Sequence, residues 1–342
     1  MKSVKELAQS LGLSSSTVYD ALRGNPRVKV QTRDRILEAA KAAGFQYNPL
    51  VGSLMSEVRR ARASTFRGVV AVVDLESPKA RPDKTEDFQS ALRRGAKKMG
   101  EQLGFKVELF VLGQEGITVA RLDSILKSRG IRGLLILPAK SAPDISELNW
   151  SEYAGVYTDC IIEKPALDSV CPDHFRAMTL ALSKAKELGY RRPGFVLQAD
   201  YDQRLLYRWE AAFRSFGLHH EGFDWIEPYT GEKLYESEFK SWFEANKPDL
   251  ILSHRIQIKA WMERLGAKIP ETHGFCKINI TTSPEPVSGL YLCPLELGQR
   301  AMQLLIGKLH RNDYGIPSVQ LTSMASPVWV DGPTMRQMQA SG

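Results

Sequence analysis

Apolar residues in the first 45 positions recur at helical spacing and predict three short helices. The first helix has a buried stripe with the spacing i, i+3, i+4, i+7, formed by Val4, Leu7, Ala8 and Leu11. Gly12 interrupts that pattern, and Ser14 is a good N-cap for a second helix. The buried face of the second helix is formed by Val18, Ala21 and Leu22. Thr32 is the expected N-cap of a third helix, which ends at Gly44 and turns three residues inward, Ile36, Leu37 and Ala40.

Beyond residue 67 the pattern changes to apolar runs that alternate with amphipathic helices. Gly68–Leu75 is a continuous apolar run, typical of a parallel strand that is covered on both faces. An amphipathic helix from Phe88 to Leu103 follows it. Further strands are expected at 107–112, 133–138, 155–159, 194–197, 250–253, 318–322 and 328–330, and further helices at 119–128, 175–188, 205–216, 239–245, 256–265 and 295–309. Repeated strand–helix units build doubly wound parallel sheets, so the sequence predicts an α/β body behind a helical head.

The head has the features of a DNA-binding element. A short helix, a Gly-containing turn and a second helix that opens on hydroxyl residues form a helix-turn-helix, which enters the major groove of DNA. Residues 1–67 hold twelve basic and five acidic residues, so they carry the whole net charge of +7. A basic head on a neutral body is expected when only the head meets phosphate.

The outer face of the second helix supplies the candidate base contacts: Ser15, Ser16, Tyr19 and Asp20. These residues lie in the N-terminal half of the helix, where helix-turn-helix proteins touch base edges. Asp20 either accepts a hydrogen bond from cytosine N4 or sits against Arg23 or Lys29. Thr17 and Asn25 are expected to contact phosphates, which position the helix without specifying the sequence.

Length and composition set broad limits on the function. The 342 residues suggest two or three domains. No run of 18 apolar residues and no secretory leader is present, which favours a cytoplasmic protein over an exported solute-binding protein. Four cysteines without close pair spacing favour isolated thiols over disulfides or a metal site: Cys160, Cys171, Cys276 and Cys293. No phosphate loop, nucleophile elbow or zinc motif indicates an enzyme, and no cofactor is expected.

With these features the chain resembles the LacI/GalR transcriptional regulators. The resemblance rests on segments that occur in order, Val4–Gly12, Leu13–Val18, Ala21–Gly24, Thr32–Phe45, Asn48–Leu50 and Ser53–Leu54. It implies a helix-turn-helix domain followed by a core like that of periplasmic binding proteins, with two doubly wound subdomains. The expected domains are residues 1–47 for DNA binding, 48–67 for a hinge helix and linker, 68–160 plus 296–323 for the N-terminal subdomain, and 161–295 plus 324–342 for the C-terminal subdomain. The chain is expected to cross between subdomains near 159–165, 292–296 and 323–327.

The resemblance also implies that residues 48–56 fold into a hinge helix on DNA. Leu54 then falls on the position of a leucine that wedges between bases. Gly52 departs from the pattern and weakens that helix by ~1 kcal/mol relative to alanine. The alternative is that Leu54 and Met55 pack on the body. Since one recognition helix reads few bases, we expect a homodimer on a pseudo-palindromic operator.

A small-molecule effector is expected between the two subdomains, because doubly wound sheets bind ligands at the carboxyl ends of their strands. By resemblance, Asp159 and Arg208 contact the effector, and Arg204 lies one helical turn from Arg208. Three further candidates depart from the family pattern: His254, Arg255 and Cys276. They favour an anionic or unusual ligand, such as a sugar acid or sugar phosphate in place of a neutral hexose, or no ligand at all. Each residue alone is equally consistent with an ordinary surface charge.

The sequence therefore predicts a DNA-binding repressor whose body senses a sugar or sugar derivative. The alternative is a solute-binding protein, or an enzyme of carbohydrate metabolism, with an incidental helical head.

Overall fold

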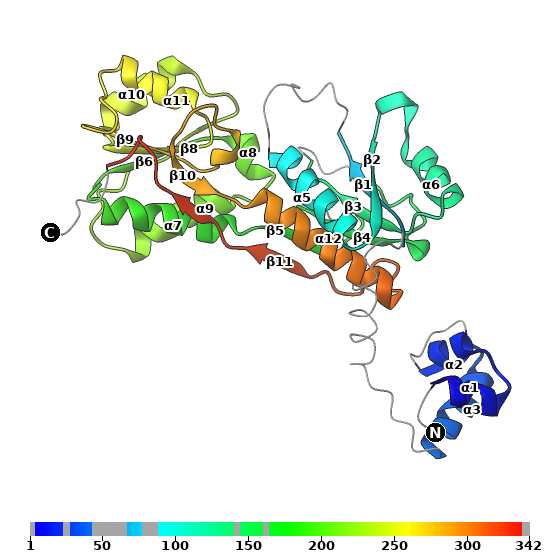
Figure 1. Cartoon of the computed structure of the whole chain (residues 1–342). Helices are drawn as coiled ribbons and strands as arrows, with labels where there is room; N and C mark the ends of the chain where they lie inside the picture. The colour runs from blue at the N-terminus through cyan, green and yellow to red at the C-terminus, as the bar shows by residue number, and fades with distance from the viewer. Residues whose placement is uncertain are drawn as a thin grey trace. The chain divides into compact units, whose positions relative to one another are not determined.

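The computed structural model describes residues 4–22, 28–42, 67–76, 88–139, 144–159 and 164–336. It divides the chain into two compact units, residues 1–64 and 65–342. The second unit contains two six-stranded sheets, each with helices on both faces (Figure 1).

The first unit contains α1 (Val4–Leu11), α2 (Ser15–Leu22) and α3 (Val30–Ala42). The three helices share a small apolar core, formed by Leu7, Ala8, Val18, Ala21, Ile36 and Ala40. The predicted N-cap of α2 is confirmed, because the hydroxyl of Ser14 accepts a hydrogen bond from the backbone N–H of Thr17 at 3.1 Å.

Two predictions for the third helix are wrong. Helix α3 starts at Val30, so Thr32 lies inside its first turn instead of capping it. Leu37 is 44% exposed, while its neighbour Ile36 is fully buried. The helix presents a narrow apolar stripe, and Leu37 lies beside that stripe.

The first sheet of the body is entirely parallel, with the strand order β11–β5–β4–β3–β1–β2. Its strands are β1 (Gly68–Asp74), β2 (Phe105–Val111), β3 (Gly133–Ile136), β4 (Ala154–Tyr157), β5 (Ser169–Pro172) and β11 (Thr322–Ala325). Helices α5 (Phe88–Gln102) and α12 (Pro294–Arg311) cover one face, and α6 (Val119–Ser128) covers the other. Short 3-10 turns occur at η2 (Gln114–Gly116) and η3 (Trp150–Glu152). We call this sheet and its helices the first lobe.

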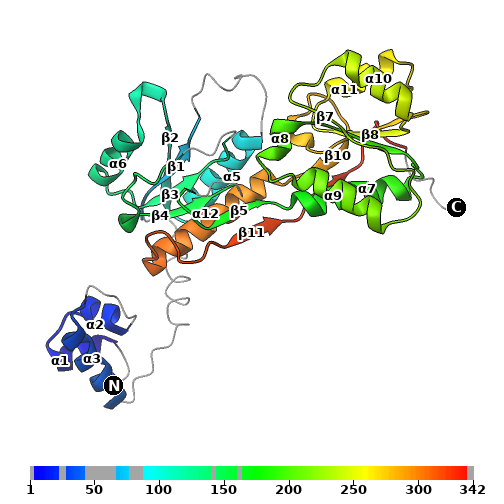
Figure 2. The ribbon, with the colours of Figure 1, turned by 180° about the vertical axis from the view of Figure 1, so that it is seen from behind.

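The second sheet has the strand order β12–β10–β9–β8–β6–β7 and is parallel except for β12. Its strands are β6 (Pro193–Gln198), β7 (Tyr229–Gly231), β8 (Leu250–Ser253), β9 (Gly274–Lys277), β10 (Ser288–Tyr291) and β12 (Val328–Val330). Helices α7 (His174–Glu187) and α9 (Arg208–His219) cover one face, and α10 (Glu236–Asn246) and α11 (Gln257–Arg264) cover the other (Figure 2). The short α8 (Ala199–Gln203) follows β6, and η4 (Ile280–Thr282) follows β9. These elements form the second lobe.

Side chains of the central strands are buried on both faces. In β1, Val70 and Val72 pack toward α5 and α12, while Ala71 and Val73 pack toward α6. This two-sided burial explains the continuous apolar run in the sequence.

Helices α5 and α12 approach each other unusually closely. A Cβ added at Gly95 would lie 1.9 Å from the carbonyl oxygen of Leu295, and one at Gly298 would lie 2.0 Å from that of Leu92. Glycine at both positions therefore sets the distance between the two helices.

The first crossing between lobes falls later than predicted. Strand β5 pairs with β4 and β11 in the first sheet, so residues up to Pro172 belong to the first lobe and not to the range 161–295. The backbone N–H of Ser169 donates to the carbonyl of Leu321 at 2.9 Å, which ties β5 to the C-terminal part of the chain. The other two crossings lie between β10 and α12 and between β11 and β12.

Candidate functional site

Helix α2 carries five of the predicted DNA contacts, Ser15, Ser16, Thr17, Tyr19 and Asp20. Thr17 and Asp20 are half-buried, and the Thr17 hydroxyl lies 2.7 Å from that of Ser14. The remaining candidates lie outside the described residues, in their side chains or entirely, namely Ser15, Ser16, Tyr19, Asn25 and Leu54.

In the body, an ion pair joins the two lobes. Asp159 lies two residues beyond β4, in the first lobe, and Arg204 directly follows α8, in the second lobe. The Asp159 carboxylate is 3.5 Å from Arg204 Nη1, with side-chain exposures of 4% and 26%. Two of the predicted effector residues, one from each lobe, are therefore in contact.

Arg204 forms the top of a stack on the second lobe. Its guanidinium lies over the ring of Tyr201 at 5.5 Å, and that ring stacks on His254 with centroids 4.4 Å apart. The stack connects the end of α8 to the end of β8. It places His254 in the same group as Arg204.

His254 lies among positive charges and is neutral. Burial, together with the nearby charges of Arg255 and Lys277, lowers the pKa of His254 to about 3. Neither of its ring nitrogens has a hydrogen-bond partner among the described residues. Lys277 donates to the carbonyls of His254 and Asn279 and to the hydroxyl of Thr282, at 2.9–3.1 Å. Its partners are neutral oxygens, and burial lowers the pKa of Lys277 to about 8.

Arg208 is the first residue of α9 and is positioned by a buried carboxylate. Asp202 accepts hydrogen bonds from the backbone N–H groups of Trp209 and Glu210 at 3.1 and 2.9 Å, which fixes the start of the helix. The preceding residues Leu206 and Tyr207 both have left-handed backbone conformations. Arg208 follows this turn and is half-buried.

The start of α7 lies next to the start of α9. His174, the first residue of α7, meets the ring of Trp209 edge-on with centroids 5.2 Å apart. Burial and the charges of Arg204 and Arg208 lower the pKa of His174 to about 3. Three buried nitrogens in this group have no hydrogen-bond partner among the described residues: His174 Nδ1, Arg208 Nη1 and Trp209 Nε1.

Arg255 lies at a separate cavity. Its Nη2 donates to Gln198 Oε1 at 2.7 Å, and both residues line a cavity of about 360 Å³ at the carboxyl ends of β6, β7 and β8. The other lining residues are Lys233, Leu234, Tyr235 and Gln257. Asp159, Arg204, Arg208 and His254 do not line this cavity.

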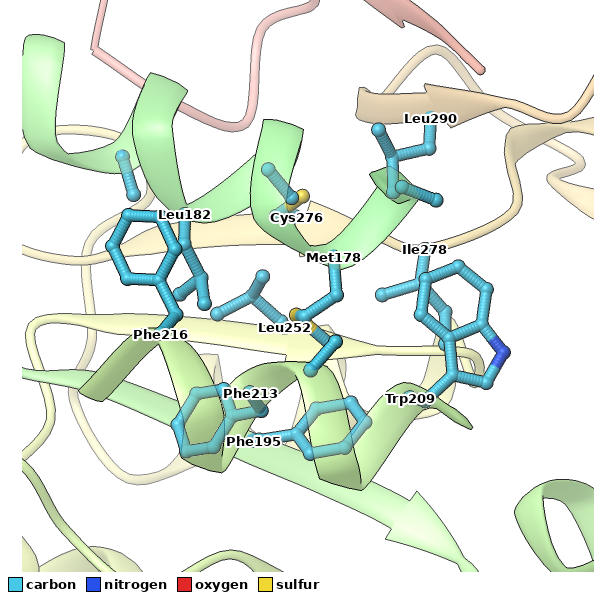
Figure 3. Packing of buried hydrophobic residues seen from close by; sticks show 14 of the residues in the cluster. Met178, Leu182, Phe195, Trp209, Phe213, Phe216, Leu252, Cys276, Ile278 and Leu290 are labelled. Atoms are coloured by element: carbon cyan, nitrogen blue, oxygen red, sulfur yellow. The ribbon is translucent and has the colours of Figure 1, made fainter. Parts of the chain in front are cut away.

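Cys276 is not a site residue. Its side chain is fully buried in the apolar core beneath α7 and α9, next to Met178, Leu182 and Leu252 (Figure 3). Successive residues of β9 point to opposite faces of the sheet, and Cys276 points to the same face as Phe195 of β6. Burial raises the pKa of its thiol, so it stays protonated. The prediction that Cys276 contacts the effector is wrong.

Sequence reasoning missed His174, Tyr201, Asp202 and Lys277. His174 carried a usable signal, since Asp173 is a good N-cap and accepts a hydrogen bond from the backbone N–H of Arg176 at 2.9 Å. The other three gain their roles from contacts between separate strands and helices, which the sequence pattern does not contain.

Comparison with known proteins adds independent information. The family model described as "Periplasmic binding proteins and sugar binding domain of LacI family" matches residues 81–227. The NTD biosynthesis operon regulator NtdR of Bacillus subtilis is 23% identical, over 91% of this chain and 94% of its own. The ribose operon repressor of Bacillus subtilis is 25% identical, over 94% of this chain and 96% of its own.

Solved structures share the fold across nearly the whole chain. A transcriptional regulator CelR–cellobiose complex aligns with a TM-score of 0.58 and 16% identity, covering 98% of this chain and 100% of that one. The Lac repressor dimer bound to operator and the anti-inducer ONPF aligns with a TM-score of 0.56 and 14% identity, covering 97% and 98%.

The three-helix head and the two-lobed core of doubly wound sheets agree with the fold of these solved structures, and both sequence relatives are named as regulators or repressors of operons. The chain is thus similar to LacI-family transcriptional regulators, over residues 81–227 by the family model and over more than 90% of its length by these two relatives. Within the described ranges, no helix is both long and apolar enough to span a membrane.

Proposed function

We propose that this protein is a repressor that binds a pseudo-palindromic operator as a homodimer in the cytoplasm, under the control of a sugar-derived metabolite. The observation that carries the proposal is the capped helix-turn-helix, α1 and α2, in a head that holds the whole net positive charge of the chain. A chain that only bound solutes or transformed sugars would have no use for such a head.

In this proposal α2 enters the major groove. Ser15, Ser16, Tyr19 and Asp20 meet base edges, while Thr17 and Asn25 meet phosphates. Leu54 wedges between base pairs at the centre of the operator, where an inserted apolar side chain bends the DNA onto more protein surface.

The effector binds where the lobes meet, at Asp159, Arg204, Arg208 and His254. An effector changes operator binding only if it binds one arrangement of the lobes more tightly than the other. Asp159 and Arg204 are suited to transmit such a difference, because their ion pair connects the two lobes. Arg255 lines the separate cavity, so we place it outside this group of four effector contacts.

Fluorescence polarisation tests the proposal most simply. The full-length chain is titrated onto a labelled duplex from its own upstream region and onto a scrambled duplex of equal length, at about 150 mM salt. We expect at least a 1,000-fold preference for the upstream duplex. Equal affinity for both duplexes would support the alternative, a solute-binding protein or enzyme with an incidental basic head.

A further inference from the structure

Lys277, the last residue of β9, is a buried lysine in the second lobe and is only 1% exposed. Its ammonium donates to the carbonyl of His254 at 3.1 Å, to the carbonyl of Asn279 at 2.9 Å and to the hydroxyl of Thr282 at 2.9 Å. A lysine ammonium has three N–H groups and no acceptor. All three donors of Lys277 are therefore hydrogen-bonded within the lobe.

The three acceptors belong to two separate segments of the chain. His254 directly follows β8, whereas Asn279 precedes η4 and Thr282 ends it. In the pairing of β8 with β9, Lys277 lies opposite Ser253, the residue before His254. The ammonium therefore ties the end of β8 to the turn that follows β9.

Charge pairing does not explain a lysine at this position. Within the described part of the chain, no carboxylate forms an ion pair with Lys277, and the nearby charge that acts on it is the positive charge of Arg255. Burial of an ammonium among neutral oxygens costs free energy, and an apolar side chain of similar length would avoid that cost. The lysine is explained by the two segments that its hydrogen bonds hold together.

The end of β8 supports the contact between the lobes. The ring of His254 stacks on that of Tyr201 with centroids 4.4 Å apart, and the guanidinium of Arg204 lies 5.5 Å from the centre of the Tyr201 ring. Arg204 Nη1 lies 3.5 Å from the carboxylate of Asp159, in the first lobe. A continuous set of contacts thus leads from the Lys277 ammonium to the first lobe.

We propose that Lys277 is a positioning residue for the contact between the lobes. Its hydrogen bonds fix the backbone at His254, and this fixes the ring on which Tyr201 is stacked. The guanidinium of Arg204, which lies over Tyr201, is thereby held opposite Asp159. Loss of the ammonium should let the stack shift and weaken the ion pair, although Lys277 touches neither of its members. This inference goes beyond the proposed function and depends neither on DNA binding nor on the identity of the effector.

Double-mutant cycles in two backgrounds test the proposal. The coupling between Asp159 and Arg204 is measured by urea unfolding of the full-length chain with Asp159→Asn and Arg204→Gln, in the wild type and in Lys277→Met. In the wild type, we expect the pair to change the equilibrium constant for unfolding by about 5- to 30-fold beyond the product of the single effects. Lys277→Met keeps a similar side-chain length but removes the three donors, so we expect this factor to fall below about 2-fold.

Lys308→Met is the matched control, because it also removes a buried lysine. Lys308 is 3% exposed, lies on α12 in the first lobe, and pairs with Asp168 and Asp313 at 2.8 and 3.1 Å. Its loss should lower the stability of the protein but leave the coupling between Asp159 and Arg204 at its wild-type value.

A milder pair of variants decides the question if Lys277→Met does not fold. Thr282→Val removes one of the three acceptors of the ammonium. Thr281→Val, in the same turn, removes a hydroxyl that has no hydrogen-bond partner among the described residues. We expect the coupling factor to fall at least about 2-fold in Thr282→Val and to stay unchanged in Thr281→Val.

Four results would overturn the proposal. The first is wild-type coupling in Lys277→Met. The second is an equal loss of coupling in Lys308→Met, because the loss of any buried lysine would then weaken the pair. The third is equal coupling in the two threonine variants. The fourth is an absence of coupling in the wild type, which would leave no contact for Lys277 to position. Operator preference is measured separately, so this inference can stand even if the regulator function fails.

Discussion

The ion pair between Asp159 and Arg204 should contribute measurably to the contact between the lobes. An exposed pair contributes up to about 1 kcal/mol, whereas breaking a fully buried pair costs about 3–5 kcal/mol. This pair lies between those cases, because Asp159 is 4% and Arg204 26% exposed at a separation of 3.5 Å. We therefore expect a coupling free energy of about 1–2 kcal/mol.

A double-mutant cycle measures that coupling. Asp159→Asn, Arg204→Gln and the double variant are unfolded in urea, and the difference between the double and the summed single effects gives the pair's contribution. Lys97 and Glu101 on α5 form the control pair, with 3.8 Å separation, exposures of 62% and 56%, and an expected coupling below about 0.5 kcal/mol. Purely additive effects at Asp159 and Arg204 would refute the idea that this ion pair holds the lobes together.

Three further predictions concern the stability of the protein: two substitutions at tightly packed positions and the effect of pH on two buried histidines. Gly298→Ala should destabilise the protein by about 1–3 kcal/mol in urea unfolding, because its Cβ would meet a backbone carbonyl at 2.0 Å. Gly307→Ala, on the same helix, should be neutral or stabilising. Cys276→Ser should lower the free energy of unfolding by about 1–3 kcal/mol, because it buries a hydroxyl, and effector affinity should stay unchanged. A changed effector affinity would show that Cys276 belongs to the site after all. Folding lowers the pKa of His174 and His254 from 6.5 to about 3, so the unfolded chain binds more protons below pH 6.5. The free energy of unfolding should therefore fall by about 2 kcal/mol per histidine between pH 6.5 and pH 5. If a double variant with His174→Asn and His254→Gln loses stability with pH as steeply as the wild type, this explanation is wrong.

The sequence pattern predicted the elements that have long or strongly periodic signals. The apolar run of β1 and the amphipathic spacing of α5, α7 and α12 are local features, and the structure contains all of these elements. Strand β5 was missed because Ser169–Pro172 is four residues long and gains its place by pairing with β4 and β11. Short strands such as β7 and β9 were missed for the same reason.

Two candidate effector residues that the sequence placed on separate elements lie together in the structure, while their role in effector binding stays a prediction. Asp159 beyond β4 and Arg204 beyond α8 were named from the sequence, and they are in contact. Cys276 failed because the pattern places it at the end of a strand without showing which face it takes. For His174 the N-cap Asp173 predicts the start of the helix but not the contact with Trp209, which lies 35 positions away on another helix.

The central claim is that this chain reads DNA sequence as a symmetric dimer. Selection from a random duplex pool tests it directly: full-length protein retains bound duplexes, which are amplified and sequenced over several rounds. We expect enrichment of one inverted repeat, whose two half-sites are read by the α2 helices of two protomers. A pool that stays random, or that converges on a motif without two-fold symmetry, would contradict it.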